Sequence, residues 1–389
     1  MASTHTVDVT GPHAAKFYTK QWHPPAGQPV IAQLCFVHGF IEHIDRYSHV
    51  FPRFASAGIA VYAFDQRGFG KTATYTPKHS QGITSWPLQL GDLEFFIQEA
   101  RKAHEGVPLY LFGHSMGGGL ALAYPTRSPP SPSVALLSGV IASSPLLRQA
   151  PAVKAPGIIV KAGSLLGRLS ATLPIKATVK AEVSWSRSPG SVPRKRTPAA
   201  IPKYKEPTLP IPSASKSAPI EAWPTGESLV TKDYKHWPKG LPLLVVHGEG
   251  DKVTDHQASK LFIRNLEKLG TTDASYEGFP GFFSAELTCS INWRQHEMHN
   301  EPGDDKWREI NFIIDWIVTR AQSVTSSSLP AAAAVPAARE AEAPDAAPDA
   351  AVSEVAASHE ISVDGGEIPS APVGMALGET AEEARASKL

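Results

Sequence analysis

The sequence predicts an α/β fold in which a mostly parallel sheet is flanked by helices. Apolar runs typical of buried strands alternate with segments of helical periodicity, first in residues 29–144 and again after residue 240. Alternation of this kind is typical of a parallel sheet that helices cover. The predicted strands are 31–37, 59–64, 109–112, 135–142 and 241–247, and the predicted helices are 47–57, 88–104, 255–269 and 307–321.

Composition divides the chain into a folded domain, residues 1–322, and a tail, residues 323–389. Residues 146–237 interrupt the alternation as an inserted cap would, and within them residues 188–223 are unusually rich in Pro, Ser and basic side chains. The tail is rich in Ala, Pro and Glu and poor in bulky apolar residues, so it cannot offset the entropy of ordering. We expect the tail to be disordered.

Charge and cysteine content exclude several function classes. The 37 basic and 37 acidic side chains leave no net charge, which argues against a nucleic-acid partner. Cys35 and Cys289 indicate neither a disulfide framework nor a thiolate metal site. The first residues lack the pattern of a signal peptide and no apolar run is long enough to span a bilayer, so we expect an intracellular protein without membrane helices.

The most informative motif is residues 113–117, GHSMG, which places Ser115 between two glycines where an apolar strand gives way to a helix. A sharp turn from strand to helix needs small residues two before and two after the central residue, because the backbone passes close to its neighbours. An ordinary glycine-rich loop is the alternative, but the flanking strand and helix favour a turn that exposes a nucleophilic serine.

A serine nucleophile needs a base, an acid that orients the base, and donors for the oxyanion. In α/β-hydrolases the acid follows a late strand, which favours Asp251, with Asp255 as the weaker second candidate and the better helix cap. The base is expected before the last helix, where His296 and His299 lie. Their spacing is one residue short of a zinc-binding H-E-x-x-H motif, so a metal site is the minor interpretation.

Two backbone N–H groups are the candidate oxyanion donors. One belongs to Met116, directly after the serine, and the other to Phe40 in the loop after the strand 31–37. A structural histidine-glycine turn at residues 38 and 39 is compatible with the same assignment.

Several separated motifs resemble those of monoacylglycerol lipases, which are S33-type serine hydrolases of the α/β-hydrolase superfamily. The resemblance covers most of residues 10–185 and 230–320. It implies an α/β-hydrolase fold with a cap, a Ser115, Asp251 and His296 triad, and oxyanion donors at Phe40 and Met116. The motifs are residues 37–43 with Arg46 and Tyr47, then 65–70, 113–118, 247–251 and 296–302.

The resemblance also implies a substrate and its contacts. Glu42, Arg46 and His299 fall where the family places polar groups near the glycerol end of the substrate, although a local salt-bridge network explains Glu42 and Arg46 nearly as well. The implied reaction cleaves a monoacylglycerol or related lipid ester without a cofactor. The alternatives are a broader lysophospholipase or carboxylesterase, an acyltransferase, or a catalytically silent binding protein.

The apolar side chains of residues 156–169 recur at helical spacing, which is compatible with an acyl tunnel or with contact to a membrane or lipid droplet. Packing within the cap explains the same pattern and is the favoured interpretation. The chain ends in Ser387, Lys388 and Leu389, a signal read by the peroxisomal import receptor, so we expect a peroxisomal protein, with a cytoplasmic one as the alternative.

Two segments depart from the family pattern, residues 188–223 in the cap and residues 281–295 directly before His296. We hypothesise that one or both are retained intron sequence, which sequencing of the transcript tests.

Overall fold

The computed structural model describes residues 2–76, 84–151, 175–176, 214–215, 218–280, 296–301 and 303–328. All of them belong to one compact unit, Met1–Ala332. Most of the predicted cap, the segment 281–295, the predicted tail and the final three residues lie outside the described residues.

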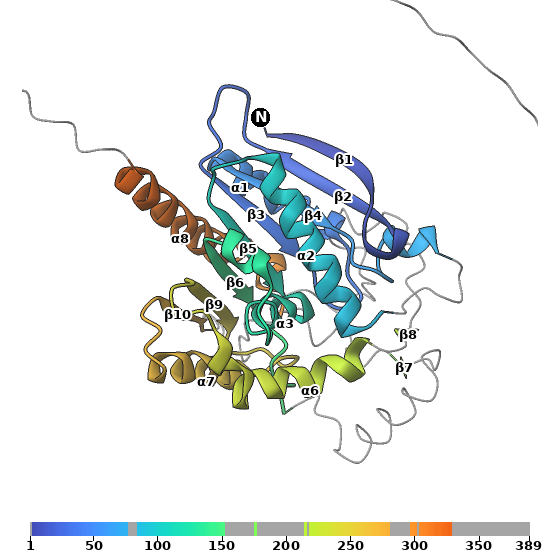
Figure 1. Cartoon of the computed structure of the whole chain (residues 1–389), viewed down its shortest axis with the longest axis vertical. Coiled ribbons are helices and arrows are strands. Elements are labelled where there is room, and N and C mark those ends of the chain that lie inside the picture. The colour runs from blue at the N-terminus through green and yellow to red at the C-terminus, as the bar shows by residue number, and fades with distance from the viewer. Residues whose placement is uncertain are drawn as a thin grey trace, which may run out of the picture. The chain divides into compact units, whose positions relative to one another are not determined.

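Among the described residues, eight strands form one sheet in the order β1-β2-β4-β3-β5-β6-β9-β10 (Figure 1). In this order along the sheet, every neighbouring pair from β4 to β10 is parallel. At the other edge β2 pairs antiparallel with β4, and β1 and β2 form an antiparallel hairpin. The predicted α/β-hydrolase fold class is therefore confirmed. The strands are β1 (Ser3–Thr10), β2 (Lys16–His23), β3 (Ala32–Val37), β4 (Ile59–Phe64), β5 (Leu109–His114), β6 (Gly139–Ser143), β9 (Leu243–Gly248) and β10 (Ala274–Phe279).

Helices cover both faces of the sheet (Figure 1). One core contains side chains of α2 (Trp86–Ala103), α3 (Met116–Ala123) and α7 (His256–Lys268). The other core contains side chains of α1 (Phe51–Ser56) and α8 (Asp305–Ser328).

Successive side chains of the central strands enter opposite cores because strand side chains alternate between the faces. Leu109 and Leu111 of β5 lie in the first core, while Tyr110 and Phe112 lie in the second. A sheet buried on both faces explains why its strands read as continuous apolar runs in the sequence.

Two predicted elements have different boundaries. The predicted helix 47–57 is a 3₁₀ turn, η2 (Ile44–Tyr47), followed by α1 from Phe51. The predicted strand 135–142 begins only at Gly139, because a 3₁₀ turn, η5 (Pro132–Leu136), occupies its first part. The Ser131 hydroxyl accepts a hydrogen bond from the Ser133 N–H and Pro132 follows it, which favours a helical turn over a strand.

The strands β1, β2 and β10 and the helix α6 (Ala218–Thr231) were not predicted individually. All three strands lie at or near the edges of the sheet, where partly exposed positions weaken the apolar signal. Helix α6 lies against α3 and α7 within the predicted cap, and it begins before residue 223, where the atypical segment was predicted to end. Strands β7 (Ile175–Lys176) and β8 (Ala214–Ser215) pair antiparallel with each other. No described helix combines the length and the apolar character that crossing a membrane requires.

We expect Phe96→Ala to lower the free energy of unfolding by about 3–5 kcal/mol, because the ring is fully buried in α2 and stacks on Phe64 with 3.9 Å between the ring centroids. The control is Lys102→Ala, whose side chain is 71% exposed on the same helix and which we expect to change stability by at most ~0.5 kcal/mol. Urea unfolding of both variants measures the difference; equal effects contradict the packing described here.

Candidate active site

Ser115 lies on the turn between β5 and α3, as predicted. Its backbone has φ 55° and ψ −117°, a left-handed conformation that is unfavourable for a residue with a side chain. The surrounding hydrogen bonds enforce it: the Ser115 N–H donates to Ser143 O at 2.9 Å, and its carbonyl accepts from Gly119 N at 3.0 Å and Leu146 N at 2.8 Å. The turn is therefore fixed on both sides of the serine.

The glycines at 113 and 117 allow two backbone segments to approach closely. A Cβ atom at Gly113 would lie 2.1 Å from Gly117 O, and one at Gly117 would lie 2.2 Å from Val37 O. Neither distance is compatible with a side chain, so the predicted need for small residues at these two positions is confirmed. The close approach also brings the end of β3 next to the serine.

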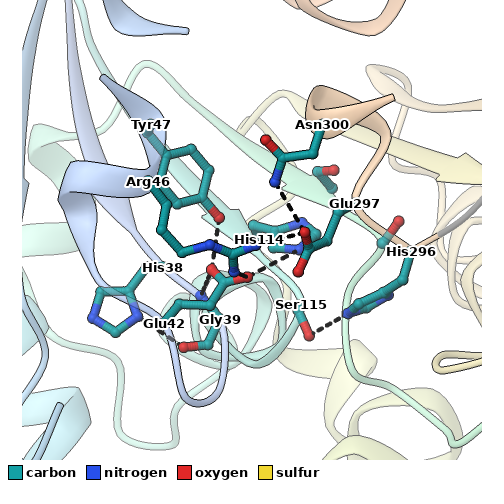
Figure 2. Close-up of polar contacts among 12 residues, drawn as sticks. His38, Gly39, Glu42, Arg46, Tyr47, His114, Ser115, His296, Glu297 and Asn300 are labelled. Carbon is teal, nitrogen blue, oxygen red and sulfur yellow. Dashed lines mark hydrogen bonds and ion pairs between the residues drawn. The ribbon is translucent and has the colours of Figure 1, made fainter. Parts of the chain in front are cut away.

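A continuous chain of hydrogen bonds joins Asp251, His296 and Ser115. The His296 Nδ1 atom is 2.8 Å from Asp251 Oδ2, and its Nε2 atom is 2.7 Å from Ser115 Oγ (Figure 2 shows the latter bond). Because a carboxylate only accepts, Nδ1 carries the proton and Nε2 accepts from the serine hydroxyl. The structure thus brings together the three residues that the sequence motifs selected.

Asp251 and His296 stabilise each other's charged forms. Burial alone would raise the pKa of Asp251, but the positive imidazole of His296 and the hydrogen bonds from His247 and His296 outweigh burial, and the pKa lies well below its ordinary value. Burial alone would lower the pKa of His296, but Asp251 raises it above its ordinary value. A carboxylate of this kind stabilises an imidazolium as soon as one forms.

Further donors surround the carboxylate of Asp251. Its Oδ1 atom accepts from Val253 N at 2.7 Å and Thr254 N at 3.0 Å, and its Oδ2 atom accepts from Thr254 Oγ1 at 2.7 Å and His247 Nε2 at 3.1 Å. Asp255, the second candidate for the acid, instead caps α7 by accepting from Gln257 N at 3.0 Å. The geometry therefore favours Asp251 over Asp255 as the partner of His296.

The two candidate oxyanion donors lie beside the serine. Met116 is the first residue of α3, where helix geometry leaves the N–H without an intrahelical acceptor. Phe40 follows Gly39, and a Cβ atom at Gly39 would lie 3.1 Å from Ser115 Cβ. The loop has a left-handed residue at Ile41, φ 55°, and is fixed by a hydrogen bond from Gly39 N to Glu42 Oε2 at 2.9 Å.

Glu42 and Arg46 belong to a buried ion-pair cluster (Figure 2). Arg46 NH1 donates to Glu42 Oε1 at 2.7 Å, and Arg46 NH2 donates to Glu297 Oε2 at 2.6 Å. Burial alone would raise the pKa of Glu42, but Arg46 and the nearby histidines hold it well below its ordinary value. These contacts match the local salt-bridge network that the sequence left open; a substrate contact stays a prediction.

Two further histidines, His114 and His299, are buried near His296. The His114 ring lies 5.0 Å from the His296 ring and 4.7 Å from the His299 ring, which in turn stacks on Tyr47 at 4.8 Å. Burial lowers the pKa of His114 to about 3 and holds that of His299 well below its ordinary value, so both are neutral at neutral pH. A glycerol contact of His299 stays a prediction, since its observed neighbours are protein side chains. The described residues contain no group of three or more side chains that could hold a metal ion.

A family model described as serine aminopeptidase, S33, matches residues 28–283. The chain belongs to this family. The match includes Ser115 and Asp251 and ends before His296. The resemblance that the motifs indicated is thereby confirmed at the level of the family.

Several relatives of this chain have names that identify them as lipases. It is 32% identical to a Schizosaccharomyces pombe protein named provisionally as a monoglyceride lipase, over 78% of this chain and 71% of that one. It is 28% identical to the monoacylglycerol lipase of Mycolicibacterium smegmatis, over 77% of this chain and 91% of the relative.

The fold of this S33 chain is shared with solved structures. A soluble variant of the Saccharomyces cerevisiae monoglyceride lipase, in complex with a substrate analog, has a TM-score of 0.65 and 22% identity, covering 81% of this chain and 94% of that one. The monoacylglycerol lipase of Paleococcus ferrophilus has a TM-score of 0.59 and 24% identity, covering 78% and 99%.

Sequence reasoning did not assign roles to Thr254, His247 and Glu297. Thr254 lies three residues after Asp251 in the same loop, and His247 lies four residues before it, near the end of β9. Glu297 directly follows His296, but its partner Arg46 is 251 positions away. No local signal identifies such a pair.

We expect the His296 imidazole to titrate above its ordinary pKa in the folded protein, and Asp251→Asn to lower this pKa, because the substitution removes the negative charge that raises it. NMR of the imidazole signals against pH measures both. Asp255→Asn is the matched control, since Asn is an equally good helix cap and the Asp255 carboxylate accepts from Gln257 N, whereas His296 is paired with Asp251. An unchanged pKa in Asp251→Asn contradicts the electrostatic coupling.

Proposed function

We propose that this chain is a serine esterase that hydrolyses monoacylglycerols to a fatty acid and glycerol. The observation that carries the proposal is the hydrogen-bonded sequence from Asp251 through His296 to Ser115, on a strained turn at the carboxyl end of β5. The lipid substrate is proposed because relatives over most of the chain are named monoglyceride or monoacylglycerol lipases.

In the first half of the proposed reaction, Ser115 Oγ attacks the ester carbonyl while its proton passes to His296 Nε2. The carbonyl oxygen becomes an oxyanion, which we expect the N–H groups of Phe40 and Met116 to bind; the start of α3 at Met116 and the closeness of Gly39 to Ser115 support this assignment. Asp251 stabilises the imidazolium that forms. When the tetrahedral intermediate collapses, the ester C–O bond breaks, His296 gives its proton to the departing glycerol oxygen, and the acyl group stays on Ser115.

In the second half, water replaces glycerol as the nucleophile. His296 Nε2 takes a proton from the water as the oxygen attacks the acyl carbon, and a second oxyanion forms at the same donors. Its collapse breaks the bond between the acyl carbon and Ser115 Oγ, and the proton on His296 returns to the serine. Fatty acid leaves, and no cofactor enters either half of the reaction.

We expect a fluorophosphonate probe to label the protein at Ser115 and Ser115→Ala to abolish the labelling. Removing the nucleophile of such a triad lowers kcat on the order of 10⁴-fold or more. Mass spectrometry of the labelled peptide identifies the site, and Ser144→Ala is the control because Ser144 is buried beside the site and has no bond to His296. A folded wild-type protein that stays unlabelled favours the catalytically silent binding protein.

The substrate class is tested with a panel of equal acyl chains on different leaving groups. We expect kcat/KM to be highest for a monoacylglycerol, lower for a lysophospholipid and a simple alkyl ester, and undetectable for an aminoacyl anilide. Product analysis by mass spectrometry separates free fatty acid from an acyl group transferred to another alcohol. Preference for the lysophospholipid or the alkyl ester replaces the proposed substrate with the broader esterase alternative.

A further inference from the structure

One guanidinium joins the loop that contains Phe40, a proposed oxyanion donor, to the segment that contains His296. Arg46 donates from NH1 to Glu42 Oε1 at 2.7 Å and from NH2 to Glu297 Oε2 at 2.6 Å (Figure 2). Glu42 lies in the loop after β3, and Glu297 lies directly after His296. The two carboxylates are therefore connected through a single side chain.

On one side of Arg46, Glu42 fixes the loop that contains Phe40. Its Oε2 atom accepts from Gly39 N at 2.9 Å and from the Tyr47 hydroxyl at 2.7 Å, while its Oε1 atom accepts from Arg46. Gly39 directly precedes Phe40. A shift of Glu42 would therefore move the peptide that is proposed to bind the oxyanion.

On the other side, contacts from the segment 43–49 fix the segment that begins at His296. Glu297 Oε2 accepts from Arg46 and from Asn300 Nδ2 at 2.9 Å, and His299 O lies 3.0 Å from His49 Nε2. Residues 296–301 follow the segment 281–295 along the chain. The contacts to residues 43–49 therefore hold the segment that carries His296.

The three side chains of these ion pairs are largely buried. The side chains of Arg46, Glu42 and Glu297 are 11%, 6% and 8% exposed. A buried ion pair that loses one partner leaves an uncompensated charge, so the remaining groups rearrange. Arg46 also presents a planar fork, which fixes the relative orientation of the carboxylates that it binds.

We propose that Arg46 is a positioning residue, which with Glu42 and Glu297 forms a clasp that sets the His296 segment relative to the oxyanion loop. The inference rests on the proposed function, because it assigns the clasp a role in the reaction of Ser115. It differs from a glycerol contact, since it assigns Arg46 a role through its bonds to two carboxylates of the protein.

The test compares Arg46→Met and Glu297→Gln with the wild-type full chain on two substrates, a monoacylglycerol and a p-nitrophenyl ester of the same acid that lacks glycerol. We expect kcat to fall about tenfold or more on both substrates, since small misplacements of catalytic groups cost this much, with KM within about twofold. The double variant is expected to fall no further than Arg46→Met alone, because Arg46→Met already removes the contact with Glu297 that Glu297→Gln weakens. Arg46→Lys keeps the positive charge but lacks the planar guanidinium, so we expect its kcat to lie between those of the wild type and Arg46→Met.

Lys20→Met is the matched control, because Lys20 binds Asp45, the neighbour of Arg46, at 2.9 Å and so contacts the same turn. An equal loss of kcat in Lys20→Met overturns the positioning role in favour of general loosening. A rise in KM confined to the monoacylglycerol overturns it in favour of a glycerol contact. Glu297→Gln preserves side-chain shape, so it decides the question if Arg46→Met does not fold. A wild-type chain that fluorophosphonate does not label instead contradicts the proposed function itself.

Discussion

The close approach of backbone at the turn between β5 and α3 is the constraint on which the site depends. Gly113 and Gly117 leave no room for a Cβ atom, and the carbonyl of Val37 fills the space that a side chain at 117 would need. Ser115 is held in a left-handed conformation by backbone bonds on both sides. The strain is supported by the two neighbouring parallel strands, so the serine cannot relax without disturbing the centre of the sheet.

Buried charge is arranged in two groups around this turn. Asp251 is saturated by donors from the backbone, Thr254 and two histidines, and it makes His296 more basic. Behind His296 lie the neutral histidines 114 and 299 and the clasp of Glu42, Arg46 and Glu297. The ionised carboxylates and the guanidinium are thus paired, whereas burial keeps the imidazoles of His114 and His299 uncharged.

The fold could be predicted from the sequence where strands are buried on both faces. Strands such as β3 and β5 read as continuous apolar runs, but the edge strands β1 and β10 are partly exposed and lack this signal. The strand β6 begins only at Gly139 because the 3₁₀ turn Pro132–Leu136 precedes it, and the apolar run alone does not separate that turn from the strand.

The candidate site was predictable where a motif is local. Ser115 follows from the flanking glycines, and Asp251 from its place after a late strand. The choice of His296 over His299 needed the family resemblance, because both lie on the same short segment. The pairing of Arg46 with Glu297 could not be predicted, since only the folded chain brings together residues 251 positions apart.

The distance along the chain between Ser115 and its hydrogen-bond acceptor has a consequence for synthesis. The bond from Ser115 Oγ to His296 Nε2 spans 181 positions. At roughly 5–20 residues per second, a ribosome needs about 10–40 s to add the histidine after the serine. During that interval the turn between β5 and α3 can form only without His296. A nascent chain therefore carries an ordinary hydroxyl at Ser115, and the serine gains its partner only after nearly the whole folded domain has left the ribosome.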